Sequence, residues 1–133
     1  YFSQKNKKKN KIIILGDDLM NIVFSGCRDF TDYDFLESKL NEILSHRNFK
    51  ILVGEAKGVD SLVRRYAKEY NIEYQVFKAD WDTHGKSAGH KRNKAMVDLA
   101  DGLIAFWDGK SKGTKSTIDF AKRKGIKVKI VNI

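Results

Sequence analysis

Residue types that bind or transform ligands gather in a few short segments of this sequence, and each segment begins where an apolar run ends. The first is residues 25–32, where a glycine turn at Gly26 is followed by the cation Arg28 and the anion Asp29. A guanidinium at such a place can form two hydrogen bonds to one phosphate. The alternative is a surface ion pair from Arg28 to Asp29 or Asp32, a common and weak interaction.

A second segment, residues 54–60, contains two glycines, Gly54 and Gly58, which allow a bound group to approach the backbone closely. Lys57 and Asp60 complete the candidate binding residues of this segment. The spacing matches neither the dinucleotide fingerprint nor the P-loop. It therefore predicts neither an ordinary NAD site nor an NTPase site.

The longest polar stretch is residues 80–93, which we interpret as an irregular loop. Loops of this length are uncommon in compact domains and usually functional. Trp81 supplies either a surface on which a base stacks or a cap over the core. His84 and His90 lack the Cys/His partner spacing of a metal site, so no metal is expected.

The fourth segment, residues 108–117, is rich in Gly, Ser, Lys and Thr and leads into a helical pattern. Backbone N–H groups at a helix N-terminus bind anions, and the hydroxyls of Ser111 and Thr114 add donors. We expect the main phosphate contact between Gly109 and Thr114, with Gly113 allowing close approach. The alternative is a flexible turn with a threonine cap.

The elements that must position these segments alternate along the chain in the pattern of a parallel α/β sheet. Short runs rich in β-branched and aromatic residues predict five strands, at residues 22–25, 51–54, 74–78, 103–107 and 128–131. Helical patterns lie at residues 35–44, after Asp60, at 92–100 and at 114–124. The sequence thus predicts an α/β, Rossmann-like three-layer sandwich with a mainly parallel five-stranded sheet, whose strand ends carry the ligand site.

The predicted helices carry recognisable end signals. Thr31 or Asp32 is placed to cap the first helix, and Asp60 to cap the second in the same way. Gly125 follows the last helix as a C-terminal cap.

Length and charge limit the domain organisation. A chain of 133 residues fits one domain, which we place at residues 20–133, preceded at residues 1–19 by a basic segment that is either a flexible arm or a leader. The short apolar run at residues 12–15 is a candidate edge strand or pairs outside the sheet. The net charge of +9 favours acidic partners.

No apolar run approaches the roughly 18 residues of a membrane span, so we expect a cytoplasmic protein without membrane contact.

The single cysteine, Cys27, cannot form an internal disulfide and directly follows a predicted strand. Most lone cysteines are small buried packing residues. A nucleophilic thiol is the alternative, because Arg28 beside it supplies a cationic neighbour.

Taken in order, these segments resemble the SLOG superfamily, a Rossmann-like group that includes the LOG-type phosphoribohydrolases and the Smf/DprA proteins, and within it the YspA/YpsA-related branch. The resemblance rests on SGCRDF at 25–30, GEAKGVD at 54–60, ADW at 79–81, GHKRNKAM at 89–96 and ADGLIAFWDGKSKGT at 100–114. It implies a Rossmann-like sheet and a nucleotide-derived ligand, held by Gly26, Arg28, Asp29, Gly54, Lys57, Gly58, Asp60, Asp80, Trp81, Arg92, Asn93, Asp108, Gly109, Ser111, Gly113 and Thr114.

The resemblance to LOG enzymes departs at one catalytic position. Arg92 matches their arginine, and Gly113 and Thr114 match their Gly-Thr pair, but Thr117 stands where those enzymes have a glutamate. A hydroxyl has no charged state near neutral pH, so the departure favours binding over LOG-type hydrolysis. Asp119 does not replace the glutamate, because two residues along a helix reverse the side-chain direction.

Three functions follow as expectations. The first is binding or sensing of a nucleoside monophosphate or of an ADP-ribose-like or NAD-derived molecule, with no cofactor. The second is hydrolysis of an N-glycosidic or phosphate bond, with the candidate catalytic residues Arg92, Glu55, Asp80 and Asp82. The third, from the Smf/DprA resemblance and the charge, is single-stranded DNA binding with Trp81. LOG-like relatives commonly dimerise, so the resemblance also implies a homodimer.

Overall fold

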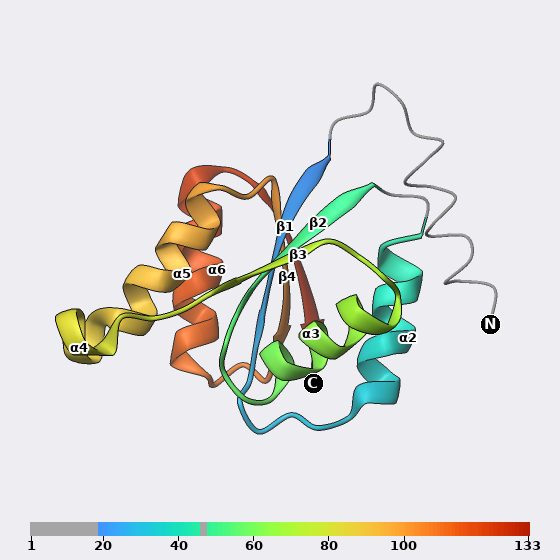
Figure 1. The fold of residues 1–133 in the computed structure, drawn as a ribbon, viewed down its shortest axis with the longest axis horizontal. Helices are drawn as coiled ribbons and strands as arrows, with labels where there is room; N and C mark the ends of the chain where they lie inside the picture. Colours follow the sequence, from blue (N-terminus) through green and yellow to red (C-terminus); the bar gives the residue numbers. More distant parts are fainter. Residues whose placement is uncertain (1–18, 46–47) are drawn as a thin grey trace.

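The computed structural model describes residues 19–45 and 48–133. The candidate edge strand at 12–15 and almost all of the basic arm lie outside this range. The described strands form one parallel sheet in the order β3-β2-β1-β4-β5 (Figure 1). Their bounds are β1 Met20–Gly26, β2 Phe49–Gly54, β3 Tyr74–Phe77, β4 Gly102–Trp107 and β5 Lys127–Asn132. All five predicted strands are confirmed.

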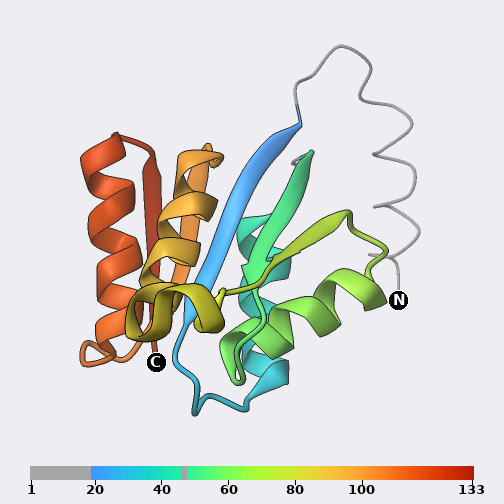
Figure 2. The same ribbon diagram turned by 60° about the vertical axis from the view of Figure 1, so that its left-hand side comes forward.

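Helices cover both faces of this sheet and complete the predicted three-layer sandwich (Figures 1 and 2). On one face lie α2 (Tyr33–Ile43) and α3 (Val59–Glu69), and on the other lie α5 (Ala88–Asp98) and α6 (Lys112–Lys124). The short helix α4 (Trp81–His84) precedes α5. None of the helices in the described ranges combines the length and apolar character that membrane crossing requires.

Side-chain alternation on β1 explains the two cores. Ile22 and Phe24 face α2 and α3, where they pack with Leu36, Leu40 and Tyr66, all buried. The intervening Val23 faces the other side and packs with buried residues of α5, α6 and the neighbouring strands, namely Met96, Val97, Ile118, Ala121, Leu52 and Leu103. A strand buried on both faces has no polar side, so it reads as a continuous apolar run.

Two of the predicted helix ends are confirmed and one is wrong. Asp32 caps α2 by accepting a hydrogen bond from the backbone N–H of Phe35 at 3.0 Å. Gly125 ends α6 in the left-handed conformation, with φ of 84°. Asp60 does not cap α3, because the cap position is Gly58 and Asp60 lies inside the first turn.

The expected irregular loop at residues 80–93 is largely helical. Asp80 accepts a hydrogen bond from the N–H of Thr83 at 3.1 Å and so begins α4, which is followed by a 3₁₀ turn, Gly85–Ser87. Helix α5 then begins at Ala88 rather than at Arg92. The polar composition concealed this helix, because its first turn buries only the small side chain of Ala88.

Candidate ligand-binding cleft

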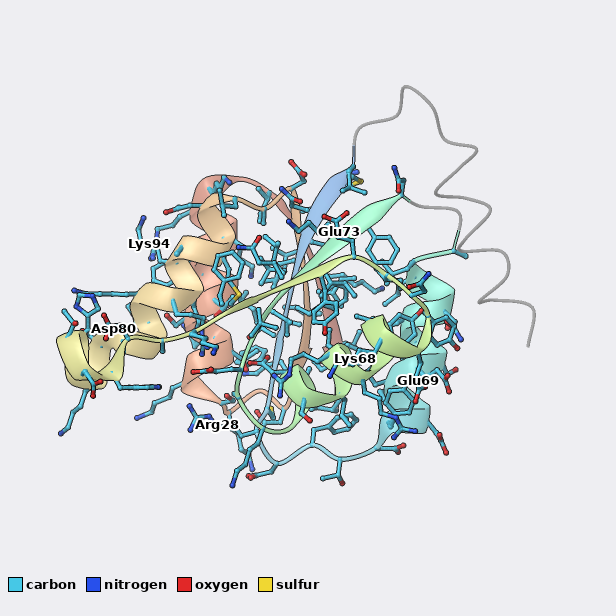
Figure 3. The ribbon with its side chains drawn as sticks, viewed as in Figure 1. Arg28, Lys68, Glu69, Glu73, Asp80 and Lys94 are labelled. Atoms are coloured by element: carbon cyan, nitrogen blue, oxygen red, sulfur yellow. The ribbon has the colours of Figure 1, made fainter. Side chains whose placement is uncertain are left out.

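A cleft of about 740 Å³ lies at the carboxyl ends of β1 and β4. Its walls are the loops after β1, β2 and β4, one side of α5 and the start of α6. Figure 3 shows Arg28 at this edge of the sheet, beyond the ends of the strands, whereas Lys94 lies on the outer side of α5. The cleft therefore occupies the place where parallel α/β sheets bind ligands.

The structure brings most of the predicted binding residues together. Those that line the cleft are Gly26, Arg28, Asp29, Asp60, Trp81, Arg92, Asn93, Asp108, Ser111, Gly113 and Thr114. Those that do not are Gly54, Lys57, Gly58, Asp80 and Gly109. Of the candidate catalytic carboxylates, Glu55, Asp80 and Asp82 are exposed and stand outside the lining.

The cleft is also lined by residues outside the predicted binding set, which are Ser25, Cys27, Ala56, Lys86, Gly89, His90, Met96, Lys110, Lys112 and Ser116. A signal for part of them was present. Gly89, Arg92, Asn93 and Met96 recur at the three- and four-residue spacing of one helix face. That spacing identifies a ligand-facing side of α5 once the helix is known to begin at Ala88.

Gly54, which ends β2, is the point at which Asp60 and Arg92 converge. A Cβ atom on Gly54 would lie 2.6 Å from Nη1 of Arg92 and 2.6 Å from Oδ2 of Asp60. No real Cβ tolerates such contacts, so the absence of a side chain leaves room for both charged groups. Gly54 therefore contributes to the cleft indirectly, by the space that it leaves behind the lining.

Asp60 is a buried carboxylate with 7% exposure. Its Oδ2 accepts a hydrogen bond from the N–H of Ala56 at 3.2 Å. Burial raises the pKa of Asp60, and the charge of Arg92 is the strongest of the influences that oppose this rise. A buried carboxylate with a perturbed pKa at a cleft is a typical feature of functional sites.

Arg92 is half-buried and held by two contacts. Its Nε donates to Oδ1 of Asn93 at 2.7 Å, and its Nη1 donates to the carbonyl of Phe77 at 3.3 Å. Burial lowers the pKa of Arg92, but an arginine stays charged at any physiological pH. Its Nη2 lies 4.0 Å from the position of a Cβ on Gly89 and has no hydrogen-bond partner among the described residues.

Trp81 does not cap the core. Its side chain is 49% exposed, lines the cleft and belongs to neither hydrophobic cluster. Its Cη2 lies 3.4 Å from the position of a Cβ on Gly89. The indole thus stands near the Nη2 side of Arg92, and a flat group can stack on its open face.

The loop before α6 is ordered by Asp108. Its Oδ1 accepts hydrogen bonds from the N–H groups of Lys110 and Ser111, both at 2.8 Å. These bonds, that of Ser111 foremost, lower the pKa of Asp108. A carboxylate of the same loop therefore uses these two backbone N–H groups, which leaves those at the start of α6 for an anion.

The first turn of α6 keeps unused donors. Ser111 makes no side-chain cap bond, and its hydroxyl instead pairs with that of Thr114 at 3.2 Å. The first N–H with a partner here is that of Lys115, which donates to the carbonyl of Ser111. Within the described chain, the N–H groups of Lys112, Gly113 and Thr114 therefore have no partner, as expected at the start of a helix.

The position of the missing glutamate is closed to ligand. Thr117 is fully buried, and its hydroxyl donates to the carbonyl of Gly113 at 3.1 Å. Asp119 pairs with Lys115 at 3.0 Å and does not line the cleft. Ser116 does line it, with its hydroxyl 3.0 Å from Nδ1 of His90. Helix α6 thus supplies backbone and hydroxyl donors but no carboxylate.

Two glycines hold the loops of the cleft against each other. A Cβ on Gly26 would lie 2.5 Å from Cγ2 of Val59 and 2.7 Å from the carbonyl of Phe106. Gly58 has φ of 71°, and a Cβ there would collide with the carbonyl oxygens of Cys27 and Arg28. Gly58 is therefore required for loop packing, and the expected direct approach of a ligand does not explain it.

Cys27 is a buried thiol, and burial raises its pKa. This agrees with a packing residue and contradicts an activated nucleophile, which requires a lowered pKa. Among the residues that the structure describes, no group of three or more His, Cys, Asp or Glu side chains is placed to hold a metal ion.

The charges of the lining favour an anionic ligand. Five lining residues carry positive charge, Arg28, Lys86, Arg92, Lys110 and Lys112, against three aspartates, Asp29, Asp60 and Asp108. A concave site of one predominant sign concentrates ligands of the opposite sign.

Comparison with known proteins identifies the family. A family model described as the YspA, cpYpsA-related SLOG family matches residues 20–84. The chain is also similar to the Gene 61 protein of Mycobacterium phage D29, with 31% identity over 118 residues, covering 83% of this chain and 94% of that protein. Membership of a SLOG family supports a role in binding or processing a nucleotide-related ligand. The chain belongs to the YspA, cpYpsA-related SLOG family.

Proposed function

We propose that the cleft binds a nucleotide or a nucleotide-derived molecule, such as a nucleoside monophosphate or an ADP-ribose-like or NAD-derived compound, and that it does so as a binding or sensing module. One observation carries this proposal. The guanidinium of Arg92 and the unpaired N–H groups at the start of α6 line a single cleft. Helix N-termini are among the strongest phosphate-binding devices in proteins, and a guanidinium donates to the oxygens of a phosphate or of a sugar.

The remaining lining suits the rest of a nucleotide. Trp81 presents an open aromatic face, and Arg28 and Lys112 add exposed cations. The cleft volume of about 740 Å³ lies within the range of small-molecule sites. The cleft thus offers an aromatic surface to a base and cations to a phosphate.

Binding without LOG-type hydrolysis agrees with the absence of a cleft-lining carboxylate on α6. A hydrolase of that type needs a carboxylate at the position of Thr117, and this residue is buried and bonded to its own helix. Glu55, Asp80 and Asp82 stand outside the cleft lining, so they offer no replacement.

A second candidate function is hydrolysis that uses Asp60. This carboxylate is buried, lines the cleft beside Arg92 and has a raised pKa, which is the condition that a general acid near neutral pH requires. Hydrolysis differs from binding alone in that the nucleotide is converted to products.

A thermal-shift screen with product analysis tests both functions. The panel contains nucleoside monophosphates and diphosphates, NAD, ADP-ribose and cyclic nucleotides, with a single-stranded oligonucleotide as a further arm. A ligand at about 100 times its Kd stabilises the fold by roughly 2.7 kcal/mol. We expect a shift without release of base or phosphate. Released base or phosphate favours the hydrolase, and a shift with the oligonucleotide alone contradicts the proposal.

Matched variants locate the site. Arg92→Ala removes the lining guanidinium, and Lys94→Ala removes a cation on the same helix that does not line the cleft. We expect the shift to fall to about half or less in the first variant and to remain in the second. Equal loss in both would indicate a response to total charge and contradict binding in the cleft.

A further inference from the structure

The carboxylate of Asp60 has a hydrogen-bond capacity that the protein does not use. Oδ2 accepts the N–H of Ala56, but Oδ1 has no hydrogen-bond or ion-pair partner within residues 19–45 and 48–133. The side chain is 7% exposed and lines the cleft. Buried polar atoms almost always have a partner, so an unpaired carboxylate oxygen in a cleft wall indicates a donor on the ligand.

The neighbour of Asp60 limits what this donor can be. Asp60 and Arg92 converge at Gly54, yet no hydrogen bond or ion pair joins them in the described structure. An ionised carboxylate only accepts hydrogen bonds and a guanidinium only donates them. A phosphate suits Arg92 alone, and an ammonium suits Asp60 alone. A hydroxyl suits both groups, because it donates a hydrogen bond to the carboxylate of Asp60 and accepts one from the guanidinium of Arg92.

We propose that Asp60 and Arg92 together bind a sugar hydroxyl, so that the cleft selects nucleotides that carry ribose over those that carry deoxyribose. This inference rests on the proposed nucleotide-binding function and names the ligand class. A second arginine near Asp60 does not compete for this role. Arg64 is already engaged, because its Nη1 donates to the carbonyls of Gly54 at 2.8 Å and Ala56 at 3.3 Å.

The assignment also orders the ligand within the cleft. Nη1 of Arg92 lies next to Asp60 and Nη2 lies toward Gly89 and Trp81. The sugar then sits at the Asp60 side of the guanidinium and the base at the indole. The phosphate is left to the exposed Arg28 and the first turn of α6.

The test compares AMP, ADP, GMP and GDP with their 2′-deoxy forms, and AMP with 3′-deoxy-AMP, by titration calorimetry of the full chain. A hydroxyl that is bonded to a charged group contributes enough for about 10-fold to 100-fold tighter binding. We expect this preference for ribose over at least one of the two deoxy forms.

Asp60→Asn assigns the preference to a residue. The amide oxygen still accepts the N–H of Ala56, while the charge that faces the hydroxyl is lost. We expect the ribose preference to fall below about threefold, with deoxynucleotide affinity held or increased because a negative charge is removed from a cleft that binds an anion. Asp82→Asn, an exposed carboxylate outside the cleft, keeps the preference. A merely structural loss would weaken both sugar forms equally.

The outcomes separate the two proposals. Equal binding of ribose and deoxyribose forms by the parent protein overturns this inference and leaves nucleotide binding intact. A folded Asp60→Asn protein that keeps the preference overturns the role of Asp60. If none of the four ribonucleotides binds, the inference fails, and the proposed function then depends on the NAD, ADP-ribose and cyclic nucleotide arms of the screen. The deoxynucleotide comparison on the parent decides the question even if Asp60→Asn does not fold.

Discussion

Arg92 and Asp60 approach each other across Gly54 without forming an ion pair in the described structure, although Asp60 is buried and Arg92 is half-buried. A buried carboxylate without a paired cation is unfavourable in a folded protein. A ligand hydroxyl bound between Asp60 and Arg92 would supply the missing hydrogen bonds to both groups. The predictions for nucleotide binding and for the pH dependence of stability depend on these two residues.

Arg92 rather than Arg28 is the cation whose loss weakens nucleotide binding most. Arg92 is half-buried and fixed by Asn93 and the carbonyl of Phe77, whereas Arg28 is exposed. A charge-assisted bond contributes about 1.5–3 kcal/mol, so Arg92→Ala should weaken binding by roughly 10-fold to 100-fold and Arg28→Ala by less. Arg92→Lys should restore part of the loss. Titration calorimetry with the tightest nucleotide of the panel measures all three, and parental affinity in folded Arg92→Ala contradicts the assignment.

Gly113→Val should abolish phosphate binding and leave the fold intact. A Cβ at Gly113 meets no atom within 4 Å, so the helix accommodates a side chain there. A branched side chain at the start of α6 then blocks the approach to the unpaired N–H groups. Gly113→Ala, which adds a single methyl group, serves as the graded control and should retain part of the affinity. Unchanged affinity in the valine variant would show that phosphate binds elsewhere.

Gly58→Ala should destabilise the fold even though it adds one methyl group. The left-handed φ of 71° costs a residue with a Cβ about 1–2 kcal/mol, and the collision with the carbonyls of Cys27 and Arg28 adds to that. Gly113→Ala is the matched control, and its free energy of unfolding should stay equal or rise by up to about 1 kcal/mol. Urea denaturation compares the two, and equal stabilities would refute this account of loop packing.

The pKa of Asp60 predicts a pH dependence of stability with a definite sign. Burial raises the pKa of this carboxyl in the folded protein above its ordinary value of 3.8, so folding favours the protonated form. Its contribution to stability is present below pH 3.8 and is lost as the pH rises through the raised pKa. The stability of Asp60→Asn relative to the parent should therefore increase from pH 3 toward neutral pH.

Urea denaturation across that pH range measures the difference, with Asp82→Asn as the control for an exposed carboxylate. The control should follow the parent at each pH. A relative stability of Asp60→Asn that decreases as the pH rises would mean that attraction to Arg92 outweighs burial at this carboxyl.

The strands and the position of the cleft could be predicted because they depend on local patterns. Parallel strands such as β1 are buried on both faces, so they read as short apolar runs, and the ligand edge follows from chain direction. The start of α5 could not be predicted in this way. Its first turn, around Gly89 and His90, is polar and glycine-containing because it faces the cleft rather than the core.

The environment of Asp60 was also beyond sequence reasoning. Its spacing from the apolar residues of α3 is that of a helix cap, but the positive φ of Gly58 moves the cap position and turns Asp60 inward. Its neighbour Arg92 is distant in the sequence, and the fold of the sheet brings the two side chains close together at Gly54. The use of loop N–H groups by Asp108 likewise depends on the turn that the loop adopts.

The central claim is that a nucleotide binds in this cleft with its phosphate at the start of α6, and amide NMR during titration of the full chain with the tightest nucleotide of the panel tests it most directly. We expect saturable shifts for the backbone N–H groups of Lys112, Gly113 and Thr114 and for the indole N–H of Trp81. The N–H groups of α2, on the opposite face of the sheet, should stay unchanged. Shifts confined to α2, or no saturable shift at α6 while a nucleotide is bound, would contradict the claim.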